Sequence, residues 1–99
     1  EVIFIKEGHE QVKVKLHEIL YLEALKDYTK IVTPKRKHCV LNSIGNLLKE
    51  EQFQSFVRIH RSFAVQKNFI EKKLPAEILL NNGSVIPIGR SYRDRLDFI

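Results

Sequence analysis

The sequence predicts a mainly β fold of small antiparallel sheets with one or two short helices. Short apolar stretches recur along the chain, and tight-turn signals separate about eight to ten of them. The spacing typical of βαβ units does not occur, so neighbouring strands should pair in antiparallel fashion. At 99 residues, with 43% hydrophobic and 29% charged residues, the chain suits a single globular domain, residues 1–99.

The N-terminal half of the chain predicts two hairpins. Residues 2–5 (VIFI) and the alternating residues 11–16 (QVKVKL) flank a polar turn, so they should pair with one face in water. Residues 28–33 (YTKIVT) have high β-propensity and should pair with residues 38–41. The intervening sequence PKRK suits a turn because proline cannot continue a central strand.

Shorter elements lie between and after these hairpins. A helical turn and then a strand should occupy residues 17–23, and residues 26–27 should form a loop. Asn42 or Ser43 can cap a helix over residues 44–51, in which apolar side chains follow helical spacing.

The C-terminal half opens with a stretch that combines apolar anchors and basic side chains. Residues 56–68 (FVRIHRSFAVQKN) begin with the alternation of a half-buried strand. Between the anchors lie Arg58, His60, Arg61 and Ser62. A purely structural strand does not need this cluster, so the stretch is a candidate for holding an arginine rigidly at the surface.

The last third of the chain predicts a hairpin and a terminal helix. Further strands should cover residues 69–74, 78–80 and 84–88. Asn82-Gly83 predicts a two-residue turn in which both residues have positive φ, and Pro87 places its strand at a sheet edge. Residues 90–99 predict a helix. Its apolar stripe would comprise Tyr92, Leu96 and Ile99, with an outer ion pair between Arg93 and Asp97.

The composition restricts partners and location. Seventeen Lys and Arg against twelve acidic residues favour a polyanionic partner, nucleic acid before membrane surface. No apolar run has the length of a membrane span, so we expect no membrane partner. The single cysteine, Cys39, should be a buried small hydrophobe, and we expect a cytoplasmic protein. Because the chain begins with Glu1 and contains no Met, we expect a domain excised from a longer protein.

The residue patterns of enzymes and metal sites do not occur. The four histidines are dispersed without metal-ligand spacing, and Ser62 is not in a nucleophile elbow. We therefore expect no catalysis, no cofactor, no metal and no small-molecule substrate.

Four segments present cations or hydrogen-bond donors without an apolar role: Lys26–Lys30, Lys35–Lys37, Arg58–Ser62 and Arg90–Arg95. Arginine pairs bidentately with guanine edges or phosphates, and hydroxyls and lysines add phosphate contacts. Each segment alone is more simply a solvated turn, and Lys35–Lys37 suits a solvated tip and a phosphate-contacting loop equally. Their recurrence favours nucleic acid. The alternative is a small β protein-interaction module with an acidic protein partner. RNA is disfavoured because no stacking platform is evident.

Three segments resemble the LytTR family of bacterial DNA-binding domains, in the family's order and spacing. They are residues 19–33 (ILYLEALKDYTKIVT), 56–70 (FVRIHRSFAVQKNFI) and 78–96 (ILLNNGSVIPIGRSYRDRL). The resemblance covers nearly the whole chain and implies an elongated arrangement of small antiparallel sheets. It also implies the output domain of a response regulator, C-terminal to a receiver domain. Such domains bind double-stranded DNA, commonly at paired repeats, and insert loop side chains into successive major grooves.

The resemblance also implies three DNA-reading loops, at residues 27–30, 60–62 and 89–91. Arg61 and Arg90 match base-contacting positions, and Ser62 matches a phosphate contact. Thr29 is short, so Tyr28 or Lys30 is the alternative reader of the first loop. The expected site residues are Tyr28, Thr29, Lys30, His60, Arg61, Ser62, Arg90 and Ser91. Lys67 and Asn68 are expected beside the DNA backbone, and Arg58 is expected to act mainly as support.

Overall fold

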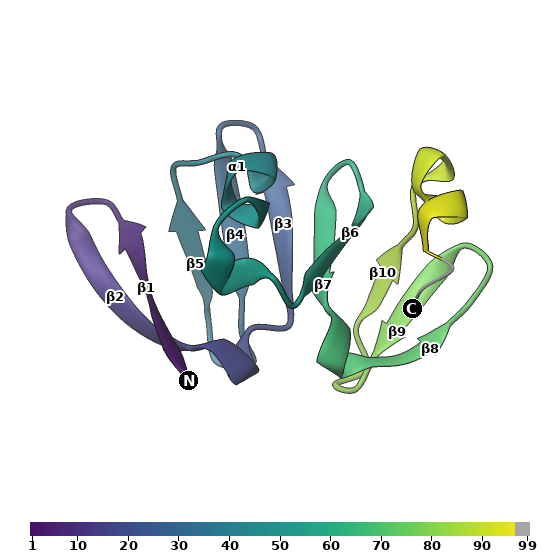
Figure 1. Ribbon diagram of the computed structural model, residues 1–99. Helices are drawn as coiled ribbons and strands as arrows, with labels where there is room; N and C mark the ends of the chain where they lie inside the picture. Colours follow the sequence, from purple (N-terminus) through teal and green to yellow (C-terminus); the bar gives the residue numbers. More distant parts are fainter. Residues whose placement is uncertain (97–99) are drawn as a thin grey trace.

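The structure, a computed structural model, describes residues 1–96 and arranges its strands in three antiparallel sheets that lie side by side (Figure 1). The strands are β1 (Val2–Glu7), β2 (Glu10–Lys15), β3 (Tyr21–Leu25), β4 (Tyr28–Val32), β5 (Lys37–Val40), β6 (Phe56–His60), β7 (Phe63–Gln66), β8 (Ile70–Lys73), β9 (Glu77–Leu80) and β10 (Val85–Pro87). The sheet orders are β1-β2, β5-β4-β3-β7-β6 and β10-β9-β8. The molecule measures 40 × 24 × 21 Å along its principal axes, so the predicted elongated, mainly β fold is confirmed.

Helical structure is limited to short pieces in residues 1–96. These are α1 (Ile44–Leu48) and four 3₁₀ turns, η1 (Leu16–Glu18), η2 (Glu51–Phe53), η3 (Lys67–Phe69) and η4 (Arg90–Arg95). None of the helices in this part of the chain is long and apolar enough to cross a membrane.

The helix expected over residues 44–51 is shorter than predicted. Its start is as expected, because the Ser43 Oγ accepts the N–H of Asn46 at 3.0 Å. The α-helix ends at Leu48, however, and η2 then turns the chain so that Phe53 is buried. The last helical turn that was expected is therefore absent, and the chain turns earlier so that the Phe53 side chain is buried.

The terminal element, expected as a helix over residues 90–99, is the 3₁₀ helix η4. The N–H groups of Tyr92 and Leu96 bond to carbonyls three residues earlier, at 2.9 and 3.4 Å. Leu96 is buried and Tyr92 packs against the same hydrophobic cluster, as the predicted stripe requires. The other residues of that prediction, Asp97 and Ile99, lie outside the described residues.

Two hydrophobic clusters pack on opposite faces of the five-stranded sheet. Successive side chains of β7 point to opposite faces of the sheet: Ala64 lies in the first cluster, and its neighbour Val65 lies in the second. The first cluster joins the sheet to the β1–β2 hairpin and α1 through Ile3, Ile5, Val14, Leu22, Ile31, Val40, Ile44, Leu47 and Phe53, among others. The second joins it to the three-stranded sheet and η4 through Val57, Ile59, Val65, Ile78, Leu80, Ile86 and Leu96, among others. The five-stranded sheet is therefore the shared wall between two cores.

The Asn82-Gly83 hairpin is present, but its turn type was predicted wrongly. Gly83 has φ +94°, whereas Asn82 is not among the described residues with positive φ. A three-residue loop is closed by the Gly83 N–H on the Leu80 carbonyl, and the Asn82 Oδ1 accepts the N–H of Ser84. That side-chain bond fits a longer turn with glycine in its last position. Pro87 lies in β10, an edge strand, as expected.

Cys39 is exposed, which corrects the prediction that it is buried. It lies on β5, an edge strand of its sheet. Its neighbours His38 and Val40 both face inward, so the period of two turns Cys39 outward.

Candidate nucleic-acid interface

Three basic turns meet at one end of the five-stranded sheet, at the top of Figure 1. They are Lys26–Lys30, where β3 turns into β4, Arg61–Ser62 between β6 and β7, and Gly89–Ser91 between β10 and η4. The Ala24 N–H donates to the Ser62 carbonyl at 2.8 Å, and the Gly89 N–H donates to the Ile59 carbonyl at 2.8 Å. These bonds lie in the turns or within two residues of them, so they hold the three turns at the same end, with Arg61–Ser62 in the middle. We refer to these three turns together as the reading edge.

The middle turn is supported from beneath by Arg58. The register of β6 against β7 shifts between Arg58 and His60, and such a bulge redirects the side chains that follow. The Arg58 guanidinium donates to the carbonyl of His60 at 3.3 Å and also to that of Arg61. Arg58 therefore holds the turn through its backbone, whereas the Arg61 side chain is exposed and forms no hydrogen bond or ion pair within residues 1–96.

His60 contributes to the same turn through its ring. Its Nδ1 accepts the N–H of Ser62 at 3.0 Å, which places the ring proton of the neutral imidazole on Nε2. The ring also packs edge-on against Phe63, with centroids 5.4 Å apart. His60 is half-buried, so its first role is to shape the turn that presents Arg61.

The third turn leaves little room for a side chain at position 89. A Cβ there would lie 3.2 Å from the Cδ2 atom of Tyr92 and 3.4 Å from the Cα atom of His60. The close approach brings Arg90 and Ser91, both exposed, beside the middle turn. The far end of η4 is anchored, because the Lys73 Nζ donates to the Leu96 carbonyl at 2.8 Å.

The first turn divides its predicted site residues between the surface and the interior. Tyr28 is exposed and Lys30 is half-buried. Thr29 is completely buried, and its Oγ1 donates to the Asn42 carbonyl at 2.7 Å. Thr29 therefore has a structural role, and we remove it from the candidate interface.

One exposed cation of the reading edge was missing from the predicted site. Lys26 has φ +56°, and it occupies the tip of the two-residue turn between the paired residues Leu25 and Tyr28. The two-residue spacing between apolar strands is the signal that could have identified it.

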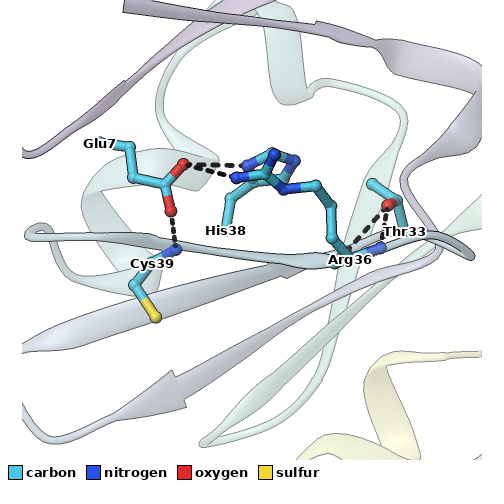
Figure 2. Close-up of polar contacts among 5 residues, drawn as sticks. All are labelled: Glu7, Thr33, Arg36, His38 and Cys39. Atoms are coloured by element: carbon cyan, nitrogen blue, oxygen red, sulfur yellow. Dashed lines mark hydrogen bonds and ion pairs between the residues drawn. The ribbon is translucent and has the colours of Figure 1, made fainter. Parts of the chain in front are cut away.

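The fourth basic segment lies at the opposite end of the sheet. The turn Pro34–Lys37 joins the far end of β4 to β5, whereas the reading edge is where β4 begins. Figure 2 shows Arg36 and His38 both facing Glu7 of β1, with Arg36 Nη2 3.8 Å and His38 Nδ1 3.0 Å from Glu7 Oε1. These contacts, with the Cys39 N–H on Oε2, hold the pKa of Glu7 below its ordinary value, the bond to His38 being the largest cause.

Lys67 and Asn68 also lie away from the reading edge. They belong to η3, which follows the last residue of β7, whereas the Arg61–Ser62 turn precedes its first residue. Among the described residues, no three His, Cys, Asp or Glu side chains form a group that could hold a metal ion.

Comparisons with known proteins identify the family of this chain. Residues 9–98 match the family model of the LytTr DNA-binding domain. The chain is 26% identical over 94 residues to the sensory transduction protein LytT of Bacillus subtilis (strain 168), a match that covers 90% of this chain and 39% of that protein. The chain thus spans about two fifths of the length of this curated relative.

A solved structure of a LytTr DNA-binding domain has the same fold as this chain. The LytTr DNA-binding domain of a putative methyl-accepting/DNA response regulator from Bacillus cereus superposes with a TM-score of 0.80 at 25% identity. The match covers 95% of this chain and 91% of that one. Because the family model spans almost the entire chain, the chain belongs to the LytTr DNA-binding domain family.

Proposed function

We propose that this domain binds double-stranded DNA sequence-specifically, as the output domain of a bacterial transcriptional response regulator. The observation that carries the proposal is the reading edge, in which backbone bonds hold three basic turns at the same end of the sheet. The major groove is about 12 Å wide and admits protruding protein elements, so turns can present side chains to base edges.

Arg61 and Arg90 are the proposed base readers. Arg61 stands exposed on a turn that Arg58 and His60 hold in shape. A guanidinium carried on such a turn can pair bidentately with guanine, and the ordered backbone reduces the entropy lost on binding. Ser62, Ser91 and Tyr28 can contact phosphates, and Lys26 and Lys30 add positive charge at the same edge. The net charge of +5 favours the approach to DNA.

The proposed assembly extends beyond this chain. The relatives are described as a sensory transduction protein and as part of a response regulator, and the chain spans 39% of the first. We propose that a receiver domain precedes the domain in a longer cytoplasmic protein. Two copies would then bind paired DNA repeats, each copy reading one repeat.

Selection of bound duplexes from a random pool tests this proposal. It should return an enriched motif that occurs as two copies at a fixed spacing. An electrophoretic titration should then compare the selected duplex with a scrambled one, for the unchanged chain and for Arg61→Ala. Loss of affinity restricted to the selected duplex supports base reading by Arg61. Equal weakening on both duplexes, or a pool without enrichment, contradicts the proposal.

A further inference from the structure

A cavity of about 600 Å³ lies between the β1–β2 hairpin, β5 and the α1–η2 segment. Among the described residues, none that line it belongs to the Arg61–Ser62 or Gly89–Ser91 turns. Its volume is within the range of about 300–1,000 Å³ found for small-molecule sites. The cavity is therefore large enough for a ligand and is separate from the two arginine turns.

The walls of the cavity expose apolar surface that the fold does not use. Phe4 of β1 is 55% exposed, Tyr28 of β4 is 48% exposed and Leu41, just after β5, is 69% exposed. The buried side chains of Val40 and Phe53 also line it. Exposed large apolar side chains from three elements around one cavity are typical of a binding site rather than of scattered surface residues.

Polar groups line one side of the same cavity. Three exposed residues of the β1–β2 hairpin, Lys6, His9 and Gln11, have side chains that form no hydrogen bond or ion pair within residues 1–96. Glu50 lines the cavity from the α1–η2 segment, where its carboxylate accepts the Gln52 Nε2–H at 2.8 Å. The hairpin side thus offers a cation and further hydrogen-bonding groups, and the acid comes from another segment.

The Glu7 contacts hold the hairpin against β5 beside this cavity. The Glu7 carboxylate lies 3.0 Å from the His38 Nδ1 and accepts the Cys39 N–H at 3.2 Å (Figure 2). In this view the Cys39 thiol points away from the carboxylate, and Cys39 is also a lining residue. Because these bonds connect the two walls, the cavity is preformed, as small-molecule sites usually are.

We propose that this cavity binds a small aromatic carboxylate. The ring packs against Phe4, Tyr28 and Leu41, and the carboxylate points to the hairpin side, toward Lys6 and His9. Positive charge beside an apolar wall favours an anion with an aromatic body over a neutral or cationic one. The cavity shares Tyr28 with the reading edge, but neither arginine turn contributes to it, so ligand binding can be tested without DNA.

An NMR titration of the chain with 1-naphthoate tests the location of the site. Amide shifts should concentrate at Phe4–Lys6 and Cys39–Asn42, with a Kd on the order of 1 mM or tighter. Bound naphthoate should also slow the alkylation of Cys39 by iodoacetamide, which is easily read because the chain has one cysteine. Shifts centred on Arg61 and Arg90, or an unchanged alkylation rate at saturation, would overturn the proposal.

Two variants test the orientation of the ligand. Lys6→Ala should weaken 1-naphthoate about two- to fivefold, the range of an exposed ion pair, and leave the neutral 1-naphthalenemethanol unaffected. Lys13→Ala is the matched control, since Lys13 is exposed on the same hairpin but does not line the cavity. If both variants weakened naphthoate equally, or if the neutral compound bound as tightly as naphthoate, the carboxylate assignment would be wrong.

Discussion

The two ends of the five-stranded sheet both carry basic turns, but the surroundings of these turns differ. At the reading edge, the Ser62 carbonyl accepts a backbone bond from β3, and the Ile59 carbonyl in β6 accepts one from Gly89. At the other end, the Pro34–Lys37 turn is apart from the three turns of the reading edge, and its Arg36 faces Glu7. The comparison indicates that convergence of several turns, rather than the number of cations in one turn, distinguishes the proposed interface.

Arg61→Ala should give the largest effect, and it acts at the reading edge. Loss of a bidentate contact to guanine should cost about 1–3 kcal/mol of binding to the selected duplex and relax the preference at one base pair. The free energy of unfolding should stay nearly unchanged, because the side chain is exposed and without partners within residues 1–96. Electrophoretic titration and denaturant unfolding measure the two quantities. A loss of stability as large as the loss of binding would contradict this assignment.

Thr29→Val should lower the stability of the fold without lowering the affinity for DNA, because Thr29 supports the first turn from the interior. The substitution keeps the shape of the side chain but removes the bond from Thr29 Oγ1 to the Asn42 carbonyl. The free energy of unfolding, measured with denaturant, should fall by about 0.5–1.5 kcal/mol. At temperatures where the variant is folded, its affinity for DNA should equal that of the unchanged chain. If the variant bound the selected duplex more weakly while its stability was unchanged, Thr29 would be assigned to the interface after all.

Glu7→Gln tests the opposite end through stability and its pH dependence. The pKa of Glu7 is lower in the folded chain than its ordinary value of 4.5. Its contribution is therefore complete above that value and disappears as the pH falls through the lower, folded-state pKa. The side chain is partly exposed, so we expect about 1 kcal/mol or less at neutral pH.

Denaturant unfolding of both proteins between pH 7 and pH 3 measures the Glu7 contribution. The difference between the two should shrink as the solution becomes acidic. Affinity for DNA should be the same for the variant and the unchanged chain at pH 7. A difference in stability that grew toward low pH would show that the assigned direction of the pKa is wrong.

Lys35→Ala should have the smallest effect. Because Lys35 lies at the end away from the reading edge, the slope of log K against log salt should be unchanged. A lost phosphate contact would instead reduce this slope by about 0.9. Titrations at several salt concentrations measure it, and Lys26→Ala is the matched variant at the reading edge. Equal slopes for both variants would remove the contrast between the two ends.

The sequence predicted the strands well because alternation, turn residues and β-branched side chains are local signals. The Asn82-Gly83 hairpin and the edge position of Pro87 are examples. The direction in which a strand faces was harder to predict. Thr29 was expected at the surface and Cys39 in the interior, because the face of each strand that is buried depends on packing against elements distant in the sequence.

The candidate site was predictable only where local sequence motifs carry it. Arg61 and Arg90 belong to motifs, so their exposed positions could be anticipated from the family resemblance. The Pro34–Lys37 turn and the β3–β4 turn lie at opposite ends of β4, whereas the convergence of the β6–β7 turn with the β3–β4 turn depends on the pairing of β7 with β3. The bonds that Arg58 and His60 make to the middle turn depend on a bulge that the sequence pattern does not indicate.

Amide chemical-shift mapping of the chain on addition of its selected duplex tests the reading edge most directly. The expected result is a set of large shifts at Lys26, Tyr28, Arg61, Ser62, Arg90 and Ser91, with the amides of Lys35–Lys37 nearly unmoved. Large shifts at Lys35–Lys37 with an undisturbed Arg61–Ser62 turn would contradict the account.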